Sequence, residues 1–196
     1  HPVAHSFPTR RSSDLDQPSW KPVRVDTVPE IAVDATRGPA VKHMQTISPR
    51  TVTAAGDKAW IVNMGQNMVG WLKLTVRGQK GRTITIRHAE MLNPDGSLYT
   101  ENLRSARQLA EYTVAGDGET VLEPHFSFFG FQYVEISGMD REPSPADMEG
   151  VVLYSACEQT GHFECSDTLL NQLYSNVVWG QRGNYLDVPT DCPQRD

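Results

Sequence analysis

The segment from Asn184 to Asp196 holds the side chains with the clearest chemical potential. Asp191 lies between two prolines, and Arg195 and Asp196 follow the second proline. A carboxylate such as Asp191 accepts hydrogen bonds from vicinal hydroxyls, and the planar guanidinium of Arg195 donates to oxygen atoms or orients a nearby carboxylate. Loops at helix ends often carry binding groups. The segment could therefore be a sugar-binding loop, but residue types and spacing alone favour a solvated, charged chain end.

His88 and Glu90 form a second polar pair, two residues apart on one face of a predicted strand. They could bind a metal or share a proton, and the His-x-Glu spacing opens the zinc deaminase signature. That signature is incomplete, since no Pro-Cys-x-x-Cys follows. We predict no metal site, and we expect ion pairing or hydrogen bonding of this pair at the sheet surface.

The cysteines Cys157, Cys165 and Cys192 are odd in number and show no Cys-x-x-Cys spacing. Neither a disulfide framework nor a thiolate zinc site is indicated. We expect buried thiols, and a bridge between Cys157 and Cys165 remains the alternative if the protein is exported.

The composition is that of an ordinary globular protein and excludes some partners. The chain has 196 residues, 38% of them hydrophobic, with 18 basic and 24 acidic residues and a net charge of -6. The charges form no long runs, so no nucleic-acid partner is expected. No stretch reaches the roughly 18 to 20 apolar residues of a membrane span, so no membrane partner is expected. No leader sequence indicates a cellular compartment.

Residues 59–154 alternate apolar and polar side chains with a period of two, as in Leu72, Leu74 and Val76. This alternation predicts half-buried strands, and Gly-rich and Asn-Pro-Asp-Gly turns separate them. No helical periodicity intervenes. We therefore predict a mainly β fold, in which residues 50–155 form an antiparallel β-sandwich or jelly-roll-like domain.

The pattern becomes helical after Cys165. Ser166 suits an N-cap and Asp167 suits a helix N-terminus. Apolar residues then recur at helical spacing at Leu169, Leu170, Leu173 and Val177. A helix from about Ser166 to Arg182 is predicted, as the first element of a severed all-α domain that occupies residues 156–196. A C-terminal helix docked on the sandwich is the alternative. An unpartnered apolar helix face predicts self-association.

The N-terminal region is expected to lie outside the sandwich. Residues 1–15 include His5 to Leu15, which resembles the translation of a sequencing-adapter oligonucleotide, so we expect no native structure there. An Arg/Ser-rich tail is the alternative reading, and the other end of the chain is expected to be arbitrary too. Residues 16–49 are punctuated by prolines and indicate a linker or the remnant of an upstream domain.

An aromatic cluster follows the third turn and includes Phe126, Phe128, Phe129, Phe131 and Tyr133. Such rings can stack on sugars, which supports a competing hypothesis of a noncatalytic carbohydrate-binding or interaction module. We expect alternate members to lie in the core instead.

Several ordered motifs resemble bacterial α-L-rhamnosidases of glycoside hydrolase family 78. Trp179 to Tyr185 and Val188 to Asp196 resemble the opening of the catalytic domain. The motifs that resemble the β-sandwich domain of that family are Gly65 to Trp71, Arg87 to Glu90, Asp95 to Thr100, Asn102 to Arg104 and Gly130 to Val134. The resemblance covers roughly Ser19 to Asp196.

The resemblance implies β-sandwich domains followed by an (α/α)6 barrel that hydrolyses terminal α-L-rhamnosyl residues with inversion. The implied partners of such an enzyme are rhamnose-containing glycosides or polysaccharides. The acid/base chemistry of such an enzyme needs no cofactor. The family's general acid is a glutamate directly after the motif that ends at Asp196, and its base lies further downstream. We therefore expect no catalytic residue in this chain and no activity of the chain alone.

Asp191 and Arg195 match family residues of the rhamnose subsite. Phe129 departs from the family, where histidine is common, and we expect this to alter packing and leave the chemistry untouched.

Overall fold

The computed structural model describes residue 24 and residues 31–195. The adapter-like segment from His5 to Leu15 lies outside the described residues. The chain divides into two units, residues 1–37 and 38–196. The described residues of the first unit form no helix or strand. All elements discussed below belong to the second unit. The described residues contain no helix with the length and hydrophobicity of a membrane span.

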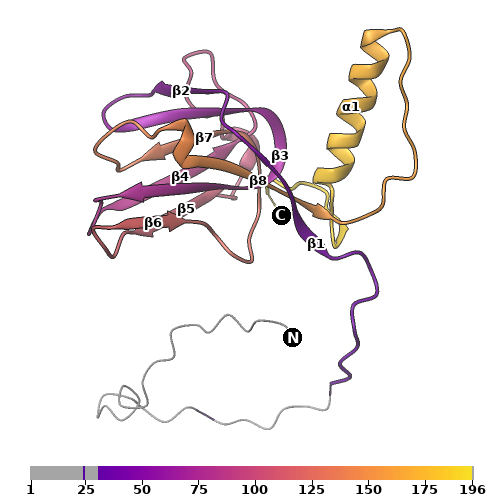
Figure 1. The fold of residues 1–196 in the computed structure, drawn as a ribbon, viewed down its shortest axis with the longest axis horizontal. Coiled ribbons are helices and arrows are strands. Elements are labelled where there is room, and N and C mark those ends of the chain that lie inside the picture. Colours follow the sequence, from indigo (N-terminus) through magenta and orange to yellow (C-terminus); the bar gives the residue numbers. More distant parts are fainter. Residues whose placement is uncertain (1–23, 25–30, 196) are drawn as a thin grey trace. The chain divides into compact units, whose positions relative to one another are not determined.

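The second unit is built around one antiparallel sheet of eight strands (Figure 1). The strands are β1 (Val41–Ile47), β2 (Thr51–Ala54), β3 (Ala59–Arg77), β4 (Thr83–Ala89), β5 (Leu109–Thr113), β6 (Glu119–Leu122), β7 (Phe129–Ser137) and β8 (Met148–Ser155). Neighbouring strands follow the order β1-β8-β3-β7-β4-β5, and β2 and β6 also pair with β3. The strands of the predicted sandwich are thus joined into one sheet that curls around its core.

The long strand β3 pairs with four other strands, β2, β6, β7 and β8, along its 19 residues. A bend in this strand curls the sheet. Its register against β7 shifts between Asn63 and Met68, where Gly65 has a φ of 77°. Extra residues on one strand bend it and increase its twist. Gly70 allows β3 to approach β8 closely, since a Cβ atom at this position would lie 1.8 Å from the Val151 carbonyl oxygen.

The core lies on the inner face of the curled sheet, where the predicted alternation places its apolar side chains. Leu72, Leu74 and Val76 of β3 are buried and meet residues of β4 and β7. The members of these two strands that are buried in the same core are Ile84, Ile86, Phe131, Val134 and Ile136. Burial of one such side chain contributes roughly 1.5–3 kcal/mol. The prediction of half-buried antiparallel strands is confirmed.

Strand β1 falls within the proline-punctuated range 16–49. It pairs antiparallel with β8, from Val41 opposite Ser155 to Ile47 opposite Gly150, with a register shift between His43 and Gln45. Most of its residues are exposed. An exposed strand shows no clear apolar alternation, which explains why the sequence pattern did not mark it.

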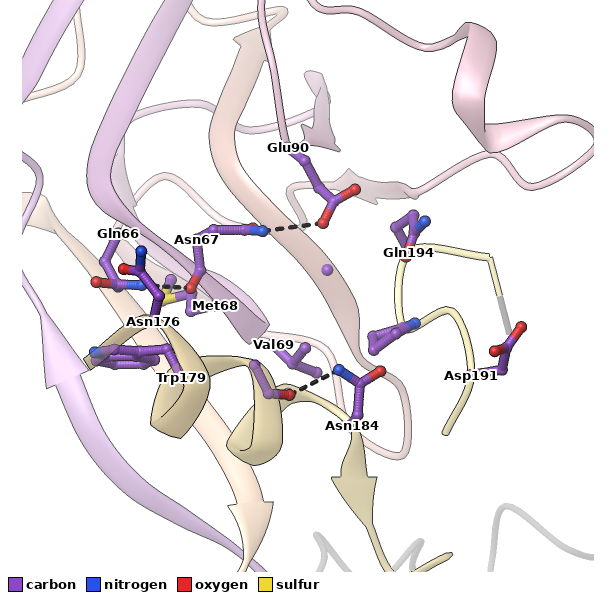
Figure 2. Close-up of a pocket in the computed structure, with 14 residues that line it drawn as sticks. Gln66, Asn67, Met68, Val69, Glu90, Asn176, Trp179, Asn184, Asp191 and Gln194 are labelled. Carbon is purple, nitrogen blue, oxygen red and sulfur yellow. Dashed lines mark hydrogen bonds between the residues drawn. The ribbon is translucent and has the colours of Figure 1, made fainter. Parts of the chain in front are cut away.

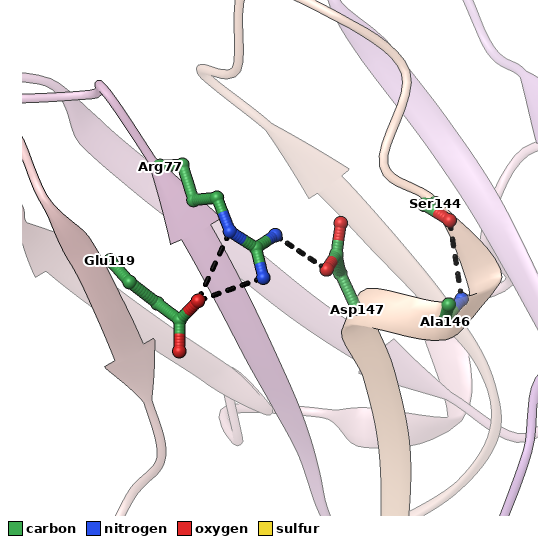
Figure 3. Close-up of polar contacts among 5 residues, drawn as sticks. All are labelled: Arg77, Glu119, Ser144, Ala146 and Asp147. Atoms are coloured by element: carbon green, nitrogen blue, oxygen red, sulfur yellow. Dashed lines mark hydrogen bonds and ion pairs between the residues drawn. The ribbon is translucent and has the colours of Figure 1, made fainter.

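Two short 3-10 helices connect the strands, η2 (Glu101–Leu103) and η3 (Pro145–Asp147). Figure 3 shows how Arg77 at the end of β3 joins two of these elements. Its guanidinium contacts Glu119 of β6 at 2.8 Å and Asp147 of η3 at 2.7 Å. Hydrogen bonds with Asp147 and then Glu119 raise the pKa of Arg77. The group is exposed, so it orients the sheet edge and adds little stability.

Helix α1 (Thr168–Gly183) follows the sheet, as predicted. Its N-cap is Asp167, not Ser166, because the Asp167 carboxylate accepts from the backbone N–H of Leu169 at 2.8 Å. The apolar residues Leu169, Leu170, Leu173 and Val177 are exposed. Only the C-terminal end of the helix meets the sheet, where Trp179 packs on the main core. A mainly antiparallel β domain with a following helix is therefore confirmed.

Candidate functional site

The segment after α1 forms a small hairpin on the sheet. Strands β9 (Tyr185–Leu186) and β10 (Val188–Pro189) pair around Asp187, which has a φ of 69°. The Asp187 N–H donates to the buried Ser155 Oγ of β8 at 2.8 Å, and Leu186 is buried against the sheet. These contacts hold the start of the predicted sugar-binding loop in place.

The two predicted site residues, Asp191 and Arg195, meet at Cys192. The Cys192 thiol donates to Asp191 Oδ2 at 3.1 Å, and Arg195 Nη2 donates to Cys192 Sγ. The Arg195 N–H also donates to the Cys192 carbonyl at 2.7 Å, which closes a turn. Cys192 is therefore a candidate site residue that the sequence did not indicate. Its position between Asp191 and a proline was the available signal.

The expectation of buried cysteines is wrong. Cys157 is exposed, whereas Cys165 and Cys192 are half-buried. Each carries a thiol, and none of the three, all within the described residues, forms a disulfide. The reason is their location: they lie in the connector to α1 and in the terminal loop, outside the sheet core.

A cavity of about 390 Å³ lies between the bend of β3, the C-terminal end of α1 and the terminal loop. Figure 2 shows the residues that line it, among them Asn67, whose side chain points toward Glu90. Five carboxamides line it, from Gln66, Asn67, Asn176, Asn184 and Gln194. Two carboxylates, Glu90 and Asp191, and the indole of Trp179 complete the polar and aromatic lining. Arg195 is not among the lining residues. Amides and carboxylates beside an aromatic ring suit a polyhydroxylated ligand.

Glu90 reaches this cavity from just beyond β4. Its carboxylate accepts from Asn67 Nδ2 at 3.0 Å and from Asn102 Nδ2 at 3.4 Å. The predicted hydrogen bonding of Glu90 is confirmed, but its partners are asparagines of β3 and η2. Strand β4 ends at Ala89, so the period of two no longer relates Glu90 to His88. In the described part of the chain, no hydrogen bond joins the two.

His88 lies in the protein interior, so the expectation that it sits at the sheet surface is wrong. Its ring stacks on Phe129 at a centroid distance of 4.1 Å and meets the edge of Phe131 at 4.7 Å. Burial lowers the pKa of His88 to about 3, against a smaller opposite effect of its hydrogen bond to the Gln108 carbonyl. The imidazole is therefore neutral near pH 7. Among the described residues, no group of three or more His, Cys, Asp or Glu could hold a metal ion.

The aromatic cluster divides between core and surface. Phe131 is fully buried, and Phe129 and Phe128 pack against separate apolar clusters. Phe126, with a φ of 59°, is fully exposed. The cluster therefore presents no row of exposed rings on which a sugar chain could stack.

Two consecutive parts of the chain match two domains of one family. Residues 53–154 match the bacterial alpha-L-rhamnosidase concanavalin-like domain, and residues 158–196 match the bacterial alpha-L-rhamnosidase 6 hairpin glycosidase domain. Sheet, helix and terminal loop thus define a region of a glycoside hydrolase, in which a β domain leads into the start of a six-hairpin domain. The chain belongs to the bacterial α-L-rhamnosidase family of glycoside hydrolase family 78.

Curated relatives include an alpha-L-rhamnosidase of Streptomyces avermitilis, 44% identical over 94% of this chain and 18% of its own length. One from Formosa agariphila is 42% identical over 97% of this chain and 21% of its own. The chain therefore spans about a fifth of the length of these relatives.

Two solved structures show the same fold. The Streptomyces avermitilis alpha-L-rhamnosidase complexed with L-rhamnose aligns with a TM-score of 0.79 at 45% identity, over 82% of this chain and 16% of that one. The Aspergillus terreus enzyme aligns with a TM-score of 0.75 at 36% identity, over 80% of this chain and 18% of that one. The expected fold and family are confirmed.

Proposed function

We propose that the protein containing this chain hydrolyses terminal α-L-rhamnosyl residues from glycosides with inversion, and that this chain supplies sugar-binding groups for the reaction. The observation that carries the proposal is the hydrogen-bonded group of Asp191, Cys192 and Arg195 beside a cavity lined by carboxamides and Trp179. A solved relative that is 45% identical in sequence over the aligned part is complexed with L-rhamnose, which supports the choice of sugar.

Each group has a defined task in this proposal. The Asp191 carboxylate accepts hydrogen bonds from the sugar hydroxyls, and the Arg195 guanidinium donates to an oxygen or orients the acid. In inverting hydrolysis, one carboxylic acid protonates the leaving oxygen and a second carboxylate activates water, with the two ~6.5–9.5 Å apart. We assign the acid to a glutamate following Asp196 and the base to a position further downstream. The chain by itself is therefore expected to be inactive.

The test is hydrolysis of an aryl α-L-rhamnoside by the protein extended with the codons that follow Asp196 in its gene. A glutamate-led Glu-Arg-x-Gly-Trp-like segment is expected within the next dozen codons. Asp191→Ala should lower kcat/KM by a factor of about 10 to 100, because hydrogen bonds to charged groups contribute roughly 1.5–3 kcal/mol. Asp187→Asn is the matched control, because Asp187 is a carboxylate of the same loop that does not line the cavity. Full activity of Asp191→Ala would refute the role of Asp191.

The competing hypothesis, a noncatalytic carbohydrate-binding module, depended on an exposed aromatic surface. Most of these rings are buried or half-buried, so no observation favours that function.

A further inference from the structure

Gln108 connects the sheet to the terminal loop from a buried position directly before β5. One nitrogen, Nε2, donates to the carbonyl of Gly130 on β7 at 3.2 Å and to the carbonyl of Gln194 at 2.7 Å. The side-chain amide thus donates both of its hydrogens to backbone carbonyls, one in each of two segments. A glutamine used in this way fixes the distance between those segments.

The backbone of Gln108 is held as firmly as its side chain. Its carbonyl accepts from the His88 N–H at 2.9 Å and from His88 Nδ1 at 3.2 Å. The neutral His88 ring packs against both Phe129 and Phe131, which restricts its orientation. Gln108 also has a φ of 50°, a conformation that non-glycine residues adopt only where their surroundings impose it.

The loop also contacts the sheet without an intervening side chain. A Cβ atom at Gly130 would lie 2.9 Å from the Gln194 nitrogen and 3.2 Å from the Pro193 carbonyl carbon. Glycine is therefore required at this position for the loop to lie on β7. The hydrogen bond from Gln108 and the bare backbone of Gly130 act on the same loop residue.

We propose that Gln108 is a positioning residue, which holds the loop of Asp191, Cys192 and Arg195 in register with the sheet. This inference rests on the proposed function, because it gives the β domain a part in presenting the sugar-binding groups. Loss of the amide leaves the Gln194 carbonyl without this donor. The loop then samples positions in which Asp191 and Arg195 no longer face the same sugar.

The first test measures the loop without any sugar, by amide hydrogen exchange of the 196-residue chain. Gln108→Met keeps the side-chain length and removes the donor. The amides of Thr190 and Arg195, which donate within the loop, should exchange at least about tenfold faster, while the β7 amides of Val134 and Ile136 keep their rates. A purely structural role would accelerate both sets together.

Matched variants keep this test falsifiable. Gln79→Met also removes a buried glutamine amide, but Gln79 lies in the turn between β3 and β4. In this variant, the amides of the terminal loop should exchange at the same rates as in the unaltered chain. Gln108→Asn retains an amide that is one methylene too short for Gln194, and it tests the same contact if Gln108→Met does not fold. Unchanged loop exchange in a folded Gln108 variant would overturn the proposal.

The second test uses the extended protein and an aryl rhamnoside. Gln108→Met should lower kcat/KM at least about tenfold, and Gln79→Met should change it less than twofold. Fast loop exchange with full activity, in a protein that Asp191→Ala inactivates, would overturn the positioning role. Activity retained by Asp191→Ala would instead refute the proposed function, and the exchange result would still decide whether Gln108 holds the loop.

Discussion

The side-chain amide of Gln108 lies 2.7 Å from the carbonyl oxygen of Gln194, which is 86 residues further along the chain. This hydrogen bond joins the family-matched β domain to the loop that follows α1 in the six-hairpin match. Together with the contact of Asp187 on Ser155, it makes the end of β8 and the Gly130 region of β7 a platform for the terminal loop.

Cys192 should support activity through its hydrogen bonds and not through reactivity. In the extended protein, Cys192→Ala removes the atom between Asp191 and Arg195, and we expect kcat/KM for an aryl rhamnoside to fall roughly five- to tenfold. Cys192→Ser keeps a donor and an acceptor there and should stay within about threefold of the unaltered protein. Equal activity of all three proteins would show that the bridge is dispensable.

The stability of the folded chain should decrease as the pH is lowered through the range set by the pKa of His88. Its pKa is about 3 in the folded chain against an ordinary value of 6.5, so the unfolded chain binds the extra proton between these values. The contribution of His88 to the free energy of unfolding is therefore fully present above pH 6.5, and it declines by up to about 1.4 kcal/mol per pH unit as the pH falls toward 3. Urea unfolding at a series of pH values measures the slope.

The matched variants for this slope are His88→Phe and His43→Gln. His88→Phe should flatten the slope, since no imidazole remains to take up a proton in the unfolded chain. His43, on the mostly exposed strand β1, serves as the control, and its variant should keep the slope. The same slope in His88→Phe would assign the pH dependence to other groups.

The exposed face of α1 should cause the 196-residue chain to self-associate. Leu169 is 78% exposed and Leu173 is 57% exposed, on a helix that meets the sheet only at its C-terminal end. The double change Leu169→Lys and Leu173→Lys should shift the chain toward monomer in sedimentation velocity, because burial of this apolar area drives association. Gln172→Lys adds a charge to an exposed helix position already polar and should leave association unchanged. A monodisperse, monomeric unaltered chain would contradict the prediction.

Phe129→His introduces the residue that the family resemblance leads us to expect at this position, and it should affect stability alone. We expect the free energy of unfolding to fall by roughly 0.5–1.5 kcal/mol, because Phe129 loses part of its stacking on His88. Thermal unfolding measures this change, and kcat/KM of the extended protein should remain within twofold. A large activity change would mean that packing at His88 reaches the sugar-binding loop.

Local patterns in the sequence were enough for the strands with one buried face and for the helix. Leu72, Leu74 and Val76 alternate because one side of β3 faces the core, so their pattern reports burial directly. Strand β1 carries no such pattern, because it has no buried face and forms only through its pairing with β8. The pairing of the strands into one curled sheet depends on the bend of β3, which period-two alternation does not express.

The chemical character of the terminal loop could be read from Asp191 and Arg195 alone, since residue type and the flanking prolines are local properties. Tertiary structure alone decided that Cys192 joins them, that His88 is buried, and that Gln108 holds Gln194. The burial of His88 and the contact of Gln108 with Gln194 depend on segments far apart in the chain meeting across the sheet, whereas the contacts of Cys192 are local and depend on the turn that the loop forms. A hydrogen bond over such a separation follows from how the strands pack, and no local spacing of residues encodes it.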